Sequence, residues 1–218
     1  DECQGSTIND SSVWANHGTL TVGGSGTNSS IGTCSGTTAQ AWYDGRTGKY
    51  GASVEFDGTD DYISLGDINT LEVTSNFTLS AWIKPGSPSG SQAILAKGGG
   101  APNGYIFNLS SGKLQMNTNS TTLTGTKTLS TGTWYHVVAV ADSSNTTFYL
   151  DGVVDKAATS LTYGSAATTA NATIGASHNG TSYANYFNGQ IDDAKFYLYP
   201  LTANQVKTLY NQGTVSFQ

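Results

Sequence analysis

Charged side chains are scarce in this 218-residue chain. They make up 11% of it, against roughly 25% in an average globular protein, and 9 lysines and arginines stand against 15 aspartates and glutamates. With a net charge of −6 we expect no basic patch for phosphates, so nucleic acids and anionic membrane surfaces are not expected partners. No apolar run approaches the ~20 residues of a membrane-spanning helix, so no membrane insertion is expected.

Cysteine is nearly absent, because the chain has only Cys3 and Cys34. Neither belongs to a Cys-x-x-Cys pair, which disfavours a metal-thiolate site. In a chain with so few charges, one pair of cysteines indicates a disulfide and a secreted or cell-surface location. We predict the Cys3–Cys34 disulfide, and two buried free thiols are the alternative. The sequence starts without a charged or apolar leader, so we expect any export segment to lie outside it.

Strand-like alternation is what the chain has in abundance. From residue 54 onward, apolar and polar side chains alternate with a period of two, as in residues 77–84. Turn dipeptides such as Asp57-Gly58 separate these runs and accept the positive φ of tight hairpins. The pattern predicts an all-β fold, a two-sheet antiparallel jelly-roll sandwich formed by one domain over residues 1–218.

One short helix is predicted near the end of the chain. Thr202 can cap it, Gln205 completes a capping box, and Gly213 ends it. Val206 and Leu209 share one face at helical spacing, so we expect the helix to pack on the sandwich.

Five segments together carry a family resemblance. They are F-D-G-T-D-D-Y-I at residues 56–63, F-T-L-S-A-W-I-K at 77–84, T-W-Y-H-V-V at 133–138, Y-L-D-G at 149–152 and F-N-G-Q-I-D-D-A at 187–194. With these segments in this order, the chain resembles the laminin G-like modules of the concanavalin A-like lectin/glucanase superfamily. The resemblance covers residues 1–213 and implies a jelly-roll module of a bacterial-type secreted or surface protein.

Asp192 is the first candidate metal ligand. It lies in phase with Ala194 and the later apolar side chains of its strand, so we expect it to point inward. A buried ionised carboxylate needs a cation, several N–H donors or a shifted pKa. The resemblance implies a calcium ion that joins the first block of the chain to the last strand, with ligands Glu2, Asp10, Asn16 and Asp192. The alternative is that Asp192 accepts backbone N–H bonds and binds no metal.

A second acidic group, Asp57, Asp60 and Asp61, follows the pattern D-G-x-D-D. An EF-hand loop would need oxygen ligands at alternate positions and a glutamate at the twelfth, and both are missing. We therefore predict a hairpin turn at Asp57-Gly58, with Asp61 accepting local backbone donors.

Catalytic residues are not evident. A retaining glycosidase needs two carboxyl groups about 5–5.5 Å apart, and the glucanases of this superfamily carry theirs in a Glu-x-Asp-x-(x)-Glu strand. The chain's glutamates, Glu2, Glu55 and Glu72, do not have that spacing. A Gly-x-Ser-x-Gly motif and a phosphate-binding glycine loop are missing as well, so we predict that the protein is not an enzyme.

Two loops offer the side chains that sugar recognition needs, which are aromatic faces and amide groups that fix the hydroxyls. The resemblance places residues 98–105 and 177–186 at one edge of the sandwich. The candidate ligand-binding residues in these loops are Asn103, His178, Asn179, Tyr183, Asn185 and Tyr186. Residues 177–179 carry no carboxylate, so a pentraxin-like site with two calcium ions is not expected.

These features favour a non-catalytic, secreted or cell-surface module that binds a carbohydrate and holds a structural calcium ion. The alternative is a protein-contact or adhesion domain of a surface filament, pilin-like or adhesin-like, that binds no glycan. The expected partner is therefore a glycan or a surface protein. The four tryptophans are expected in the core or covering a sheet.

Overall fold

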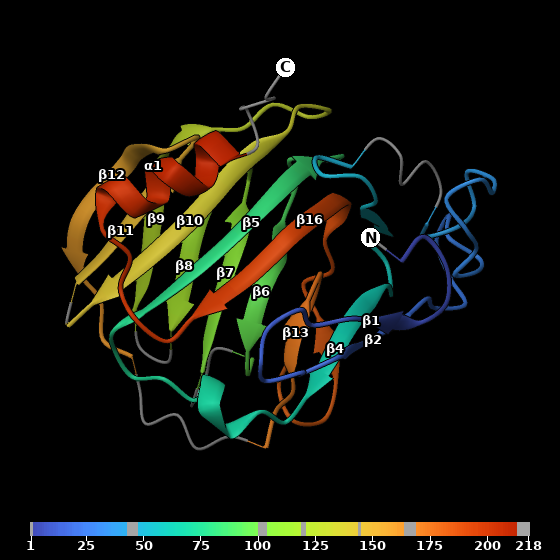
Figure 1. Cartoon of the computed structure of the whole chain (residues 1–218), viewed down its shortest axis with the longest axis horizontal. Helices are drawn as coiled ribbons and strands as arrows, with labels where there is room; N and C mark the ends of the chain where they lie inside the picture. The colour runs from blue at the N-terminus through green and yellow to red at the C-terminus, as the bar shows by residue number, and fades with distance from the viewer. Residues whose placement is uncertain are drawn as a thin grey trace.

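The computed structural model describes residues 2–42, 48–99, 104–118, 121–143, 145–163 and 169–212. Two antiparallel β-sheets face each other, and helix α1 (Ala203–Gln212) lies across the outside of the smaller one (Figure 1). This arrangement confirms the predicted all-β sandwich. Within the described residues, no helix has the length and apolar character that crossing a membrane requires.

The larger sheet has eight strands, and the smaller sheet has six. In spatial order the larger sheet contains β1 (Thr7–Ile8), β2 (Gly18–Thr21), β4 (Tyr62–Gly66), β13 (Ala172–Ile174), β6 (Ser91–Lys97), β7 (Tyr105–Ser110), β8 (Lys113–Thr118) and β9 (Thr122–Thr128). The smaller sheet contains β12 (Val153–Ser160), β11 (Asn145–Leu150), β10 (Tyr135–Asp142), β5 (Phe77–Pro85), β16 (Asn188–Tyr197) and β3 (Val54–Asp57). Outside the two sheets lie the hairpin of β14 (Ser177–His178) and β15 (Tyr183–Ala184), the 3₁₀ turn η2 (Asn69–Leu71) and α1 (Ala203–Gln212).

Apolar and polar side chains alternate along the strands, and this places one face of each sheet in the core. Phe77, Leu79 and Ile83 of β5 are at most 1% exposed and belong to the central apolar cluster. Phe107 and Leu109 of β7 join the same cluster from the larger sheet. Burying a side chain of this size contributes roughly 1.5–3 kcal/mol, so the stacking of the two inner faces is the main source of stability.

Helix α1 covers part of the outer face of the smaller sheet, over β10 and β11 (Figure 1). Its predicted capping box is present: Gln205 N–H donates to Thr202 Oγ1 at 3.3 Å, and Thr202 N–H donates to Gln205 Oε1 at 2.8 Å. Val206 is fully buried and packs in one cluster with Val138 of β10. The predicted end of the helix, Gly213, lies outside the described residues.

The β14–β15 hairpin covers part of the outer face of the larger sheet. β14 packs against β6, and Tyr183 stacks on Tyr62 of β4 with 3.7 Å between the ring centroids. Asn171 Nδ2 donates hydrogen bonds to Tyr183 Oη and to Ser64 Oγ. The hairpin is therefore fixed over β4 and β6.

The predicted disulfide joins Cys3 to Cys34, with 4.9 Å between their Cα atoms. Cys34 N–H also donates to the carbonyl of Cys3. Farther along the chain, the buried Trp42 donates from Nε1 to the carbonyl of Gly5 at 2.9 Å. The disulfide and these bonds hold the long, irregular segment that follows β2 close to the beginning of the chain.

Trp82 and His136 lie side by side between the smaller sheet and α1, with 5.2 Å between their ring centroids. Tyr210 of α1 stacks on Trp82, so this tryptophan covers a sheet, as predicted. For Trp14 the prediction is wrong, because this side chain is 64% exposed. His136 Nε2 and Ser80 Oγ share a hydrogen bond at 2.9 Å. Burial lowers the pKa of His136 from 6.5 to about 4, and nearby lysines, including Lys195, add to the effect.

Because the folded protein binds the His136 proton more weakly than the unfolded chain does, this residue makes the protein less stable in acid. Above pH 6.5 the neutral His136 does not reduce the free energy of unfolding. As the pH falls from 6.5 toward 4, the free energy of unfolding decreases, by up to about 3 kcal/mol. We expect His136→Gln to flatten the pH dependence of the free energy of unfolding in this range, measured by urea denaturation. An unchanged dependence in His136→Gln would contradict the assignment.

Candidate functional site

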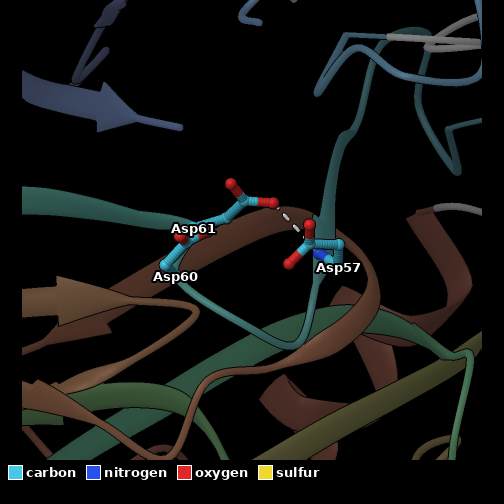
Figure 2. Close-up of side chains that lie close together, drawn as sticks. All are labelled: Asp57, Asp60 and Asp61. Atoms are coloured by element: carbon cyan, nitrogen blue, oxygen red, sulfur yellow. Dashed lines mark hydrogen bonds between the residues drawn. The ribbon is translucent and has the colours of Figure 1, made fainter. Parts of the chain in front are cut away.

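Three aspartates surround the turn between β3 and β4 (Figure 2). Within the described residues, Asp57, Asp60 and Asp61 form the acidic group in which one oxygen of each carboxylate lies within 4.8 Å of the others. Asp61 is fully buried and accepts hydrogen bonds from Asn28 Nδ2 at 2.6 Å, Asp57 N–H at 3.0 Å and Gly23 N–H at 3.3 Å. Burial raises the pKa of Asp61, and these donors offset part of the rise.

The loop that supplies Gly23 and Asn28 also donates to the other two aspartates, although Asp60 Oδ1 is buried without a hydrogen-bond partner among the described residues. Thr27 N–H donates to Asp57 Oδ2 at 2.8 Å, and Ser25 N–H donates to Asp60 Oδ2 at 2.8 Å. The backbone approaches this closely because residue 23 is glycine: a Cβ there would lie 1.9 Å from Asp60 Cγ. The three carboxylates therefore accept N–H groups and anchor the loop, and Asp61 accepts a local backbone donor, as the sequence predicts. The predicted hairpin is wrong, because β3 and β4 belong to different sheets and the turn at Asp57-Gly58 joins one sheet to the other.

A polar pocket of about 410 Å³ opens beside this turn. It lies between the β3–β4 turn, the loop from β5 to β6 and the segment from β15 to β16. Its lining consists of hydroxyl and amide side chains, one aspartate, one glycine and one aromatic ring: Asp57, Gly58, Ser87, Ser89, Ser91, Gln92, Asn185, Tyr186 and Asn188.

Hydrogen bonds hold the walls of this pocket in place. Gln92 is only 5% exposed, and its Nε2 donates to the carbonyls of Ser87 and Ser89. Its Oε1 accepts from Asn188 N–H at 3.0 Å, while Asn188 Nδ2 donates to the carbonyl of Asp57 at 2.6 Å. Gln92 and Asn188 thus connect the three chain segments, so the walls of the pocket are ordered without a ligand.

Tyr186 brings an aromatic ring to the pocket and lies close to Tyr62 and Tyr183. Burial raises the pKa of Tyr186, and it also raises the pKa of Tyr62. Both phenols are therefore neutral at ordinary pH. This surface offers ring faces, hydroxyls and amides, which are the groups that recognise neutral polar ligands.

A sequence profile of the Concanavalin A-like lectin/glucanases superfamily matches residues 57–207, which is more than half of the chain. The chain belongs to this superfamily. Among curated proteins, none matches it in sequence.

Solved structures of the same fold include domain 4 of AbnA, a GH43 extracellular arabinanase from Geobacillus stearothermophilus, in complex with arabinotriose. That domain is 24% identical with a TM-score of 0.63, over 88% of this chain and 87% of the other. The CBM40 of Ruminococcus gnavus IT-sialidase is 16% identical with a TM-score of 0.59, over 72% of this chain and 97% of the other. Trypanosoma rangeli sialidase is 17% identical with a TM-score of 0.54, over 73% of this chain and 27% of the other. At these identities the likeness is one of fold.

In this member of the superfamily, two predicted ligand-binding residues, Asn185 and Tyr186, line the polar pocket. Asn179 lies at the tip of the β14–β15 hairpin, and its Oδ1 accepts the N–H groups of Thr181 and Ser182. Asn103 lies outside the described residues.

The other two predicted ligand-binding residues, His178 and Tyr183, pack within the hairpin. His178 is 8% exposed, and its Nδ1 accepts Asn171 N–H at 3.0 Å. Burial lowers the pKa of His178, which keeps its imidazole neutral at physiological pH. Tyr183 lies between His178 and Tyr62, so these two side chains hold the hairpin in position next to the pocket.

Sequence reasoning missed the pocket residues of the β5–β6 loop and of the start of β6: Ser87, Ser89, Ser91 and Gln92. The run S-P-S-G-S-Q is a recognisable turn signal. Its meeting with residues 185–188, however, is a long-range contact that no local pattern contains.

Asp192 does not share the phase of Ala194, in contrast to the prediction. Asp193 adopts a positive φ of 48°, and the register between β16 and β5 shifts after Asp192. Asp192 consequently lies opposite Trp82, and opposed residues of an antiparallel pair share a face, here the outer one. It accepts Tyr50 N–H at 2.8 Å, while burial raises its pKa.

The four predicted calcium ligands nevertheless line one groove of about 820 Å³: Glu2, Asp10, Asn16 and Asp192. Within the described residues, the carboxylates of Glu2, Asp10 and Asp192 do not come together with oxygens within 4.8 Å. Asp10 Oδ2 instead accepts Asn16 N–H at 2.8 Å, and Glu2 Oε1 accepts Asn9 N–H at 3.0 Å. The calcium ion stays a prediction.

We expect Asp61→Asn to lower the free energy of unfolding by about 1–3 kcal/mol. The amide keeps the shape of the carboxylate, but its NH₂ group faces hydrogen-bond donors that only an oxygen can satisfy. Urea denaturation measures the loss. Asp142→Asn, at an exposed carboxylate, should stay within about 0.5 kcal/mol of the wild type. Equal stability of Asp61→Asn and the wild type would mean that the loop does not depend on this anchor.

Proposed function

We propose that this chain is a non-catalytic, extracellular carbohydrate-binding module whose sugar binds in the polar pocket beside Tyr186. The observation that carries the proposal is the combination, in one pocket, of fixed hydroxyl and amide groups with an aromatic ring. A sugar presents hydroxyls around a C–H face, so it needs both kinds of contact at once.

The chemistry of the pocket fits a hydroxyl-rich ligand. Ser87, Ser89 and Ser91 both donate and accept hydrogen bonds, as sugar hydroxyls do. The carboxylate of Asp57 already accepts backbone N–H groups from Thr27 and Thr59, so it brings little uncompensated charge to the pocket.

Structures of the same fold add support. Domain 4 of AbnA holds arabinotriose, and the CBM40 of IT-sialidase has been seen with alpha2,3 sialyllactose. Both belong to larger enzymes that act on carbohydrates. An extracellular location for the present chain agrees with its Cys3–Cys34 disulfide.

A second candidate function, protein contact or adhesion, rests on a different surface. Val13, Trp14, Leu198 and Tyr199 are 97%, 64%, 44% and 51% exposed, and all four line the groove beside β16. Exposed apolar patches of this kind mark interaction surfaces.

The two functions predict different effects of two tyrosine substitutions. We expect Tyr186→Ala to weaken binding to a responding glycan about tenfold or more, since a lost stacking contact of about 1.4 kcal/mol corresponds to that factor. Tyr199→Ala, the control in the other surface, should leave glycan affinity unchanged. A broad glycan array followed by calorimetry measures both. An array without any response would overturn the carbohydrate proposal and leave adhesion as the better account.

The proposal includes a structural calcium ion in the groove beside β16. Glu2, Asp10, Asn16 and Asp192 supply the oxygen ligands that calcium prefers, and the groove brings the start of the chain to its last strand. Binding would replace the N–H bonds that Asp10 and Asp192 now accept, so the loop around Asp10 would rearrange around the ion.

Removal of calcium should destabilise the protein. At a calcium concentration 100 times Kd the ion adds about 2.7 kcal/mol, so a chelator should lower Tm by about 5–10 °C. Differential scanning calorimetry with and without chelator measures this shift, and Asp192→Asn should reduce it. The same Tm in calcium and in chelator would remove the ion from the proposal without affecting the sugar pocket.

A further inference from the structure

Five polar side chains cross three neighbouring strands on the outer face of the larger sheet. We call them the amide ladder: Asn108 of β7, Gln115 and Asn117 of β8, and Thr122 and Thr124 of β9. Register places Asn108 opposite Gln115, Gln115 opposite Thr124, and Asn117 opposite Thr122. Their sequence neighbours point into the core, so the ladder faces outward.

Hydrogen bonds fix the ladder internally. Asn117 Nδ2 donates to Asn108 Oδ1 and to Gln115 Oε1, each at 3.0 Å. Gln115 Nε2 donates to Thr124 Oγ1 at 3.1 Å, and Thr122 Oγ1 donates to Asn117 Oδ1 at 2.8 Å. Asn108 is fully buried, whereas both threonines are exposed. The ladder is therefore a row of held polar groups whose outer members face solvent.

The amide ladder continues directly from the polar pocket. Asn108 Nδ2 donates to Ser91 Oγ at 3.0 Å, and Ser91 lines the pocket. One polar strip thus runs from the pocket at the β3–β4 turn, through Ser91, across β7, β8 and β9.

The strip is mostly neutral in the groups that a ligand would meet. Every member of the amide ladder is an amide or a hydroxyl, and the one charged residue of the pocket lining, Asp57, has its carboxylate bonded to backbone N–H groups. One cation adjoins the strip, because Lys113 at the start of β8 pairs with Ser110, which pairs with Ser91 of the pocket. Five amides and hydroxyls beside one ammonium group favour a sugar chain that is neutral over most of its length.

From this continuity and neutrality we infer that the ligand is an extended neutral oligosaccharide, with one end in the pocket and further sugar units on the amide ladder. The inference rests on the proposed carbohydrate function and deepens it. Because internal hydrogen bonds already fix the ladder's rotamers, binding orders few side chains, and each added sugar unit gains affinity.

Chain length is the decisive variable in the test. Calorimetry would use arabino-, xylo-, gluco- and galacto-oligosaccharides of one to six units, together with alpha2,3 sialyllactose. In the series that responds, we expect affinity to rise at least about tenfold between the shortest ligand that binds and the longer ones. Equal affinity at all lengths, or binding of sialyllactose in preference to every neutral series, would overturn the inference.

Variants separate the ladder from the pocket. Gln115→Ala and Thr122→Val should remove the gain from added units and leave the affinity for the shortest ligand unchanged, whereas Tyr186→Ala weakens binding at every length. Thr19→Val is the matched control, because Thr19 is an exposed threonine on β2 of the same sheet, far along the strand order. Thr122→Val keeps a β-branched shape at an exposed position, so it provides the test even if Gln115→Ala fails to fold.

The outcomes distinguish the extended site on the amide ladder from the sugar pocket. Long and short ligands that bind alike in the wild type and in both ladder variants would remove the extended site and leave the sugar pocket standing. No binding of any probe would overturn the carbohydrate function and the extended site with it.

Discussion

The placement of the polar pocket depends on one requirement, which is that the three aspartates of the β3–β4 turn find hydrogen-bond donors. Asp61 is fully buried, and an ionised carboxylate without partners in that position would be unstable. Residues 23–28 provide the donors, and the Cys3–Cys34 disulfide closes the larger loop to which they belong. With the turn fixed, Asp57 holds Asn188 through its carbonyl, and so the pocket keeps its shape.

Local patterns were sufficient for the architecture. Period-two alternation revealed the strands, and the Thr202 and Gln205 capping box marked the helix, because both signals depend only on neighbours within a few residues. The same reasoning was wrong for Asp192. The positive φ at Asp193 adds a residue to β16 and reverses the phase, and side-chain spacing alone does not reveal such a bulge.

Only part of the candidate site could be predicted from the sequence. Asn185 and Tyr186 stand in a segment rich in aromatic and amide side chains, which is a visible signal. The serines of the β5–β6 loop and the donors that reach Asp61 across more than 30 residues come together only in the folded chain. Asn108 and its partners looked like ordinary strand residues, because the network that joins them crosses three strands.

Helix α1 has a consequence for the geometry of the whole module. By packing Val206 and Tyr210 on β10 and β5, it covers the outside of the smaller sheet over these strands, while the groove beside β16 stays open. On the opposite side of the sandwich, beyond the β14–β15 hairpin, the polar strands β8 and β9 stay accessible, so the molecule has a front and a back. Under the proposed function, a sugar chain would approach the molecule from the front.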